Sequence, residues 1–208
     1  MDAPRLYLIT SPISDWAVYP PLLDAAIKAC DVACVLLRFA SDGEAAKEQI
    51  ARALVPLLQK HGVACLVADD PQLAARVNAD GVHIEGAGPE LLSALRSLHP
   101  GSIVGAGGLT TRDAAMTAGE AGADYLMFGG PESSEPHACI VERVAWWAEI
   151  FNVPCVGYAH DLCAVGDLVG AGAGFIALGD AFFADPSGAG AALRAAARLV
   201  SSIPETIP

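Results

Sequence analysis

Short hydrophobic segments recur along the chain, and each is followed by a stretch with helical character. The clearest is residues 125–128, four hydrophobic residues between a small-residue turn at 121–124 and the pair Gly129-Gly130. A short run bounded by turn residues is typical of a buried strand. Similar stretches at 78–86 and 172–180 indicate that one structural unit is used repeatedly.

Eight segments of this kind predict strands at 6–10, 32–38, 63–68, 82–84, 102–105, 125–128, 154–157 and 174–178. The run at 32–38 is continuously apolar up to its final arginine, which is typical of a strand covered on both faces. The intervening stretches predict helices at 20–30, 44–60, 72–78, 89–98, 110–121, 138–151, 161–171 and 187–201. In the second helix Ile50, Leu54, Leu57 and Leu58 share one face.

Strict alternation of strands and helices predicts parallel strands joined by right-handed crossovers. Eight such units in 208 residues predict an α/β protein, a (β/α)8 TIM barrel formed by one domain over residues 1–208. A doubly wound open sheet is the alternative, because alternation alone does not show closure. No G-x-G-x-x-G motif follows the first strand, which weakens that alternative.

Composition and charge exclude several classes of function. The chain is 53% hydrophobic and 17% charged, as in a globular protein, and its net charge of -12 argues against a nucleic-acid-binding surface. Small phosphorylated ligands are still compatible with this charge, because backbone N–H groups bind phosphate. Nothing near Met1 resembles a secretion signal, and no apolar run approaches the roughly 18 residues of a membrane span. We therefore expect a cytoplasmic protein with no membrane partner.

In a barrel the carboxyl ends of all strands meet at one face, so the candidate residues are those at strand ends. Arg38 either clamps a phosphate bidentately or pairs internally with Asp69. Asp69 and Asp70, which precede Pro71, either hold a metal ion or begin the next helix as a cap. Glu85 follows the fourth strand closely enough to supply a further metal ligand.

Two histidines are candidates for acid–base chemistry. His83 lies in an apolar strand, so it is either a satisfied core histidine or a general base. His160 precedes Asp161 after the seventh strand, and the two residues could form an acid–base pair. Alternatively Asp161 caps the following helix.

Glycines at the strand ends are candidates for binding phosphate. Around the fifth strand, Gly105, Gly107 and Gly108 precede a capped helix, which allows either an anion-binding nest or a simple chain turn. Other candidates follow the sixth, seventh and eighth strands: Gly129, Gly130, Gly157 and Gly179.

From about residue 5 to residue 200 the chain resembles the thiamine-phosphate synthase and thiazole tautomerase family. The resemblance rests on 6–10, on Leu37-Arg38, on 67–70, on 122–125, on 174–181 and above all on 79–84, which contains Asp80-Gly81-Val82-His83-Ile84. It implies a (β/α)8 barrel that joins a pyrimidine diphosphate to a thiazole phosphate, releasing pyrophosphate with the help of Mg²⁺.

The chain departs from the family pattern at many site positions. Of the polar residues in the pattern Q-L-R-x-K only Arg38 is kept, and of two metal carboxylates only Asp69 is kept, with Glu85 as a replacement candidate. The family's serine and histidine after the fifth strand are absent from residues 105–110, and its lysine is absent from residues 133–137. The glycine cradle of the family is not kept at residues 157–161, and Leu178-Gly179 replaces its late Ile-Ser pair. A diphosphate leaving group needs cations and aimed N–H donors, so these losses predict weakened synthase chemistry.

Two functions are therefore open at this point. The first is a thiamine-phosphate synthase-like transferase with a rebuilt site that holds a phosphorylated heterocycle through Arg38, Asp69 and the glycine loops. The second is a non-catalytic relative that binds a ligand or a partner. Mg²⁺ is the expected cofactor of the first, and exposed apolar helices of this fold class favour a homodimer.

Overall fold

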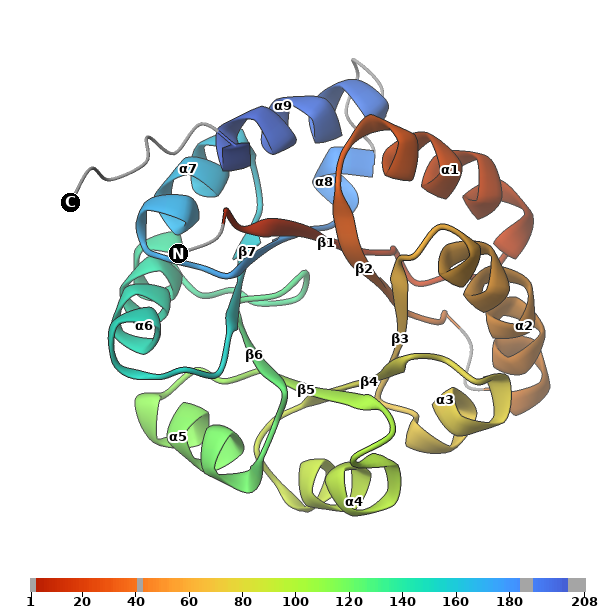
Figure 1. Ribbon diagram of the computed structural model, residues 1–208, viewed down its shortest axis with the longest axis horizontal. Helices are drawn as coiled ribbons and strands as arrows, with labels where there is room; N and C mark the ends of the chain where they lie inside the picture. The colour runs from red at the N-terminus through yellow and green to blue at the C-terminus, as the bar shows by residue number, and fades with distance from the viewer. Residues whose placement is uncertain (1–2, 41–42, 184–188, 202–208) are drawn as a thin grey trace.

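The barrel is closed by eight parallel strands in the order β1 to β8 (Figure 1). The computed structural model describes residues 3–40, 43–183 and 189–201. The strands are β1 Arg5–Ile9, β2 Val32–Leu37, β3 Ala64–Ala68, β4 Gly81–Glu85, β5 Ile103–Gly107, β6 Tyr125–Phe128, β7 Cys155–Ala159 and β8 Phe175–Leu178. The closing pair is β1 with β8, in parallel register. The predicted (β/α)8 fold is confirmed, and the open sheet was wrong.

Helices surround the barrel in the predicted order: α1 Tyr19–Ala29, α2 Glu44–Lys60, α3 Pro71–Val77, α4 Pro89–Leu98, α5 Arg112–Ala121, α6 His137–Ile150, α7 Leu162–Gly170 and α9 Ala189–Ser201. Two short helices, η1 Trp16–Val18 and α8 Asp180–Phe183, were not predicted. The predicted start of the last helix, residues 187 and 188, lies outside the described residues. Within the described ranges, no helix has the length and apolar character needed to cross a membrane.

Local sequence determines where three helices begin. Asp70 and Asp161 accept hydrogen bonds at 2.8 Å from the backbone N–H groups of Leu73 and Ala164, the third residues of α3 and α7. Thr111 does the same for α5. These bonds satisfy backbone donors that have no partner within the helix. The reading of Asp161 as a helix cap is therefore confirmed.

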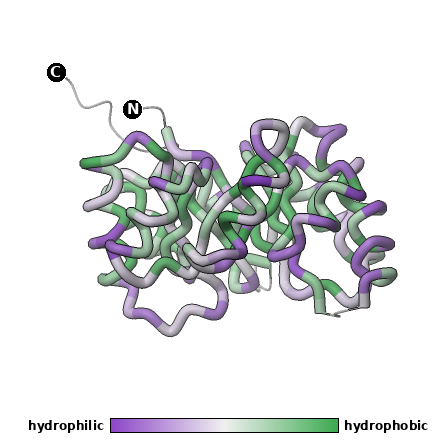
Figure 2. Tube along the Cα trace, turned by 90° about the horizontal axis from the view of Figure 1, so that it is seen from below, coloured by the Kyte–Doolittle hydropathy of each residue, from purple (hydrophilic) through white to green (hydrophobic). Residues whose placement is uncertain are grey.

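The core has two parts, one between strands and helices and one inside the barrel. Figure 2 shows apolar positions along the strands and hydrophilic positions gathered at the outer turns. In the outer part Trp147 is 1% exposed, packs against Phe128 and donates its indole N–H to Val153 O at 2.7 Å. The inner part includes Tyr7 and Tyr125, so the barrel is filled by side chains and leaves no pore.

The fourth and fifth strands extend further toward the mouth than predicted. Glu85 is the last residue of β4, and β5 continues past its predicted end at Gly105 to Gly107, where the sequence had indicated a loop. In these positions their backbone groups take part in the sheet, with Glu85 opposite Gly107. The strand ends therefore bring β4 side chains up to the mouth of the barrel.

Candidate active site

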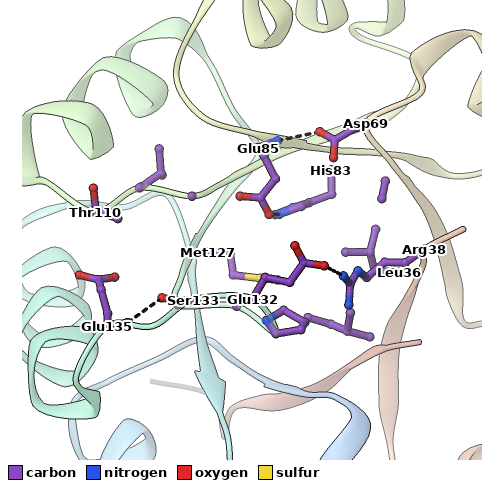
Figure 3. A pocket seen from close by; sticks show the side chains of 17 residues that line it. Leu36, Arg38, Asp69, His83, Glu85, Thr110, Met127, Glu132, Ser133 and Glu135 are labelled. Carbon is purple, nitrogen blue, oxygen red and sulfur yellow. Dashed lines mark hydrogen bonds and ion pairs between the residues drawn. The ribbon is translucent and has the colours of Figure 1, made fainter. Parts of the chain in front are cut away.

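A cavity of about 360 Å³ lies at the carboxyl ends of the strands. Its 17 lining residues come from the ends of β1 to β6 and from the loops that follow (Figure 3). Apolar side chains including Ile9, Leu36 and Met127 line it beside the polar residues Arg38, Asp69, His83 and Glu85. The structure thus brings together four of the polar residues predicted from strand ends.

Arg38 follows β2 and is mostly buried, with 17% of its side chain exposed. Its guanidinium forms an ion pair and hydrogen bond with Glu132, which lies in the loop between β6 and α6 that extends over part of the barrel opening (Figures 1 and 3). Its backbone N–H donates to Thr10 Oγ1 at 3.0 Å. Among the described residues the internal partner of Arg38 is therefore Glu132, where the sequence had suggested Asp69.

Asp69 sits at the cavity edge in a left-handed backbone conformation, with φ of 52°. Its backbone N–H donates to His83 O at 2.8 Å, and its Oδ1 accepts the backbone N–H of Glu85 at 2.9 Å (Figure 3). Because Asp70 supplies the helix cap, the Asp69 carboxylate is left at the cavity. Such backbone conformations are uncommon outside glycine and occur preferentially at functional sites.

His83 is 1% exposed and belongs to a column of buried rings. Its Nδ1 lies 2.8 Å from the Tyr125 hydroxyl, and the two rings are stacked. The Tyr125 hydroxyl lies 2.9 Å from that of Tyr7. His83 Nε2 has no hydrogen-bond partner among the described residues, and Glu85 Oε1 is 3.6 Å away. One ring nitrogen is therefore anchored, and the other faces the cavity.

The electrostatics of the site keep Glu85 ionised. The neighbouring His83 ring, and to a smaller extent Arg38, lower the pKa of the Glu85 carboxyl, while burial acts in the opposite direction. Burial raises the pKa of both Tyr7 and Tyr125 well above the ordinary value. Both tyrosines therefore keep their hydroxyl hydrogens.

Four carboxylates but only one Lys or Arg line the cavity in the described part of the chain. Glu132 is paired with Arg38, and Glu135 is paired with the buried Arg143. Asp69 and Glu85 have no lysine or arginine partner within the described ranges. They are the candidate metal ligands, although no group of three or more His, Cys, Asp or Glu in those ranges is arranged to hold a metal ion by itself.

His160 lies apart from the cavity, on the rim near α6 and α7. More than half of its side chain is exposed, its Nε2 is 3.3 Å from Asp161 Oδ2, and its ring contacts His137 at 5.1 Å between centroids. His137, which lies one residue before the helix predicted over 138–151, is the half-buried first residue of α6, with Nε2 3.1 Å from Asp167 Oδ2. The structure does not bring His160 together with Arg38 and His83.

The predicted glycines divide into two groups. Gly108, Gly129 and Gly130 line the cavity. Gly105, Gly107, Gly157 and Gly179 are not part of that lining and leave room for neighbouring side chains. Gly108 and Gly129 also leave room, for Glu85 and Ile140, so only Gly130 of the three lining glycines has nothing within 4 Å of a Cβ. A Cβ atom at Gly157 would lie 2.6 Å from Leu168 Cδ2, and one at Gly179 would lie 2.8 Å from the Tyr158 hydroxyl.

Sequence reasoning missed Tyr7, Tyr125 and Glu132. A tyrosine inside an apolar strand needs a partner for its hydroxyl, and this rule could have identified both tyrosines as members of a buried polar network. Glu132 gives no local signal, because its contact with Arg38 depends on how the loop folds over the mouth.

Comparison with known proteins agrees with the resemblance noted in the sequence. The sequence model of the family described as thiamine monophosphate synthase matches residues 6–182. A thiamine-phosphate synthase from Rhodospirillum centenum is 39% identical over 194 residues, covering 91% of this chain and 94% of the relative. One from Hyphomonas neptunium is 33% identical over 209 residues, covering 96% of this chain and 95% of the relative.

The fold is shared with a solved structure as well. Thiamine phosphate pyrophosphorylase from Pyrococcus furiosus superposes with a TM-score of 0.79 over 95% of both chains, at 22% identity. The barrel architecture, the family match over residues 6–182 and the 33–39% identity to named synthases over more than 90% of the chain point to the same family. The chain belongs to the thiamine monophosphate synthase family.

Proposed function

We propose that this chain binds a small phosphorylated heterocycle of thiamine biosynthesis in the cavity at the barrel mouth. We further propose that it transfers a pyrimidine from its diphosphate to thiazole phosphate only weakly. The observation that carries both statements is that Arg38 is the single Lys or Arg among the described lining residues, and that it is paired with Glu132.

The ligand phosphate would take the place of the Glu132 carboxylate on Arg38. A guanidinium binds a phosphate and a carboxylate through the same planar pair of donors. Glu132 is 82% exposed, so its side chain can move into solvent without leaving a buried charge behind. Gly130 lines the cavity in the same loop as Glu132, and nothing lies within 4 Å of a Cβ there, so the backbone at Gly130 can approach a ligand closely.

Asp69 and Glu85 fit a Mg²⁺ ion that arrives with a phosphorylated substrate. Both are oxygen ligands without a lysine or arginine partner in the described part of the chain, and Mg²⁺ in proteins often takes one or two carboxylates together with substrate phosphates. When bound, the ion would neutralise charge on a diphosphate leaving group. Asp69 is held in place for this role by its bond from the Glu85 backbone N–H.

Weak transfer follows from the charge balance of the cavity. Departure of a diphosphate requires several positive groups, whereas the described lining of this cavity has one arginine and two carboxylates without a lysine or arginine partner. Each missing donor of this kind typically lowers the rate by ~10²–10³. A monophosphate requires less compensation, so ligand binding is retained more easily than catalysis.

The test uses purified protein with thiazole phosphate, the pyrimidine diphosphate and Mg²⁺. We expect thiazole phosphate to raise the melting temperature, and Arg38→Gln to abolish that shift. We expect pyrophosphate release at least ~10²-fold slower than with the Rhodospirillum centenum synthase assayed in parallel. Equal rates would contradict weakened catalysis, and a missing thermal shift would contradict binding.

A thermal shift with no detectable turnover would identify the chain as a non-catalytic binding protein, the second function left open by its sequence. Glu142→Gln is the matched control, because Glu142 pairs with Arg112 in an exposed ion pair outside the lining of the cavity. This variant should retain the thermal shift.

A further inference from the structure

Three aromatic rings form a polar column inside the barrel that ends at the cavity. The column runs from Tyr7 through Tyr125 to His83, with contacts of 2.9 Å between hydroxyls and 2.8 Å to His83 Nδ1. The three residues are 2%, 6% and 1% exposed. Gly105 and Gly107 make this packing possible, because Cβ atoms there would overlap the Tyr125 ring and the His83 ring.

Counting hydrogens fixes the direction of the hydrogen bonds in this column. Within the described ranges, the Tyr7 hydroxyl has one hydrogen-bond partner, the Tyr125 hydroxyl. If Tyr7 donates to Tyr125, then Tyr125 donates to His83 Nδ1, and both hydroxyl hydrogens are used. In the opposite direction the Tyr7 hydrogen would be buried without an acceptor, which typically costs about 1–3 kcal/mol.

The favoured direction determines the tautomer of the neutral His83 ring. Since Nδ1 accepts from Tyr125, the ring hydrogen is on Nε2. This nitrogen is buried and has no hydrogen-bond partner among the described residues, while His83 lines the cavity. Glu85 Oε1 is 3.6 Å away, too far for a hydrogen bond. A buried N–H donor is therefore left facing the cavity.

We propose that the Tyr7 and Tyr125 hydroxyls hold His83 as the Nε2–H tautomer, and that this N–H donates to an acceptor atom of the bound ligand. The acceptor is a phosphate oxygen or an unprotonated ring nitrogen of the heterocycle. His83 is the group that contacts the ligand, and Tyr125 is a positioning residue. The ligand part of this proposal rests on the proposed function, whereas the tautomer does not.

The tautomer is tested on the ligand-free protein by ¹⁵N NMR of the histidine ring nitrogens at pH 8.5. We expect a protonated Nε2 and an unprotonated Nδ1 for His83. Tyr125→Phe keeps the ring but removes the hydroxyl, so it should shift the ¹⁵N signals toward a mixture of tautomers. Tyr158→Phe is the matched control. Tyr158 packs against the same inner cluster, but among the described residues its hydroxyl takes no part in the hydrogen bonds of the column, so the ¹⁵N signals should stay unchanged. Protonated Nδ1 in the unmodified protein would overturn the proposal.

The donor role is tested by titrating thiazole phosphate, inorganic phosphate and the unphosphorylated thiazole alcohol into the labelled protein. Saturation should move the His83 Nε2 signal, and Tyr125→Phe should weaken binding about 3- to 10-fold. A response to inorganic phosphate identifies a phosphate oxygen as the acceptor, and a response to the alcohol alone identifies the ring.

His83→Gln, which can place an amide N–H near the position of Nε2, should retain more affinity than His83→Leu. If thiazole phosphate binds but the His83 signal and the affinity of Tyr125→Phe stay unchanged, this inference fails while the proposed function stands. If none of the three probes binds, both the proposed function and the hydrogen bond from His83 to a ligand are wrong. The ¹⁵N measurement on the ligand-free protein then still tests whether the tyrosines hold His83 as the Nε2–H tautomer.

Discussion

The two sides of the barrel mouth use similar sequence features differently. On the β2 to β6 side, polar side chains at strand ends face a cavity, and Gly108, Gly129 and Gly130 line it. On the β7 and β8 side, the place of a side chain at Gly157 is taken by Leu168 of α7, and the place at Gly179 by Tyr158. The cavity side is not free of such contacts, because a Cβ at Gly108 would meet Glu85 and one at Gly129 would meet Ile140. The two sides therefore differ in the polar side chains that face the cavity, and a glycine at a strand end indicates mainly the close approach of a neighbouring side chain.

The charged and polar residues that line the cavity lie on the β2 to β6 side of the mouth. TIM barrels frequently bind phosphate after the seventh and eighth strands. Here the described residues that line the cavity come from β1 to β6 and their loops, and His160 on the other side is exposed on the rim. The phosphate contacts that we propose therefore lie at Arg38 and the loop between β6 and α6.

The largest effect is expected from Gly105→Ala in β5. The added methyl would overlap the buried Tyr125 ring, and overpacking of this kind costs about 3 kcal/mol in free energy of unfolding. Gly130→Ala is the matched control, because nothing lies within 4 Å of a Cβ there and the change should stay within about 0.5 kcal/mol. Urea denaturation measures both, and equal losses would contradict a packing role for Gly105.

A smaller loss is expected from Gly157→Ala in β7. Its Cβ would meet the Leu168 side chain, which can shift partly, so we expect a loss of about 1–2 kcal/mol. A double-mutant cycle with Leu168→Ala should show coupling of at least about 0.5 kcal/mol. The affinity for thiazole phosphate should not change in folded Gly157→Ala, and a clear loss would place a ligand on the β7 side after all.

Removal of the α7 cap by Asp161→Ala should cost about 1 kcal/mol at pH 7. The Ala164 N–H is the main cause that lowers the pKa of the Asp161 carboxyl. A lowered pKa stabilises the fold above the ordinary aspartate value of about 3.9, and that stabilisation is lost as the pH falls through the lowered folded-state value.

The difference between Asp161→Ala and the unmodified protein should therefore shrink from pH 7 to pH 2.5 in thermal unfolding. Asp70→Ala, which removes the corresponding cap on α3 at the cavity side, gives the comparison for pH 7. A difference for Asp161→Ala that grows in acid would contradict the assignment of this carboxylate as a charged cap.

The smallest stability effect is expected from Glu132→Gln. Glu132 is mostly exposed, so loss of its ion pair with Arg38 should change the free energy of unfolding by less than about 1 kcal/mol. Because Arg38 is released, thiazole phosphate should bind up to about fivefold more tightly in calorimetric titration. Weaker binding would show that Glu132 helps to hold the ligand.

The order of strands and helices could be predicted because each buried strand is a short apolar run and several helices carry their own caps. Arg38, Asp69, His83 and Glu85 were predicted from strand ends, and the closed barrel brings them together. The closing pair of β1 with β8 joins residues that are far apart in sequence, so closure was an inference from the number of units.

Which strand residues face the inside of the barrel and which face the helices was harder to predict. β7 runs from Cys155 to Ala159, so it begins one residue later and ends two residues later than expected. Side chains on a strand alternate between its faces. Gly157 therefore faces α7, whereas the sequence had suggested a phosphate cradle. The ring column likewise depends on register between β4 and β5 and between β5 and β6.

The left-handed backbone of Asp69 limits which residues can occupy that position. Glycine, asparagine and aspartate tolerate this conformation best, and aspartate alone among them carries a charge. Glycine would retain the bend but lose the side-chain oxygen that accepts the Glu85 N–H, and asparagine would retain both but lose the charge. Asp69→Asn therefore separates the shape of the cavity rim from its charge, whereas a residue that does not tolerate the left-handed conformation would change both.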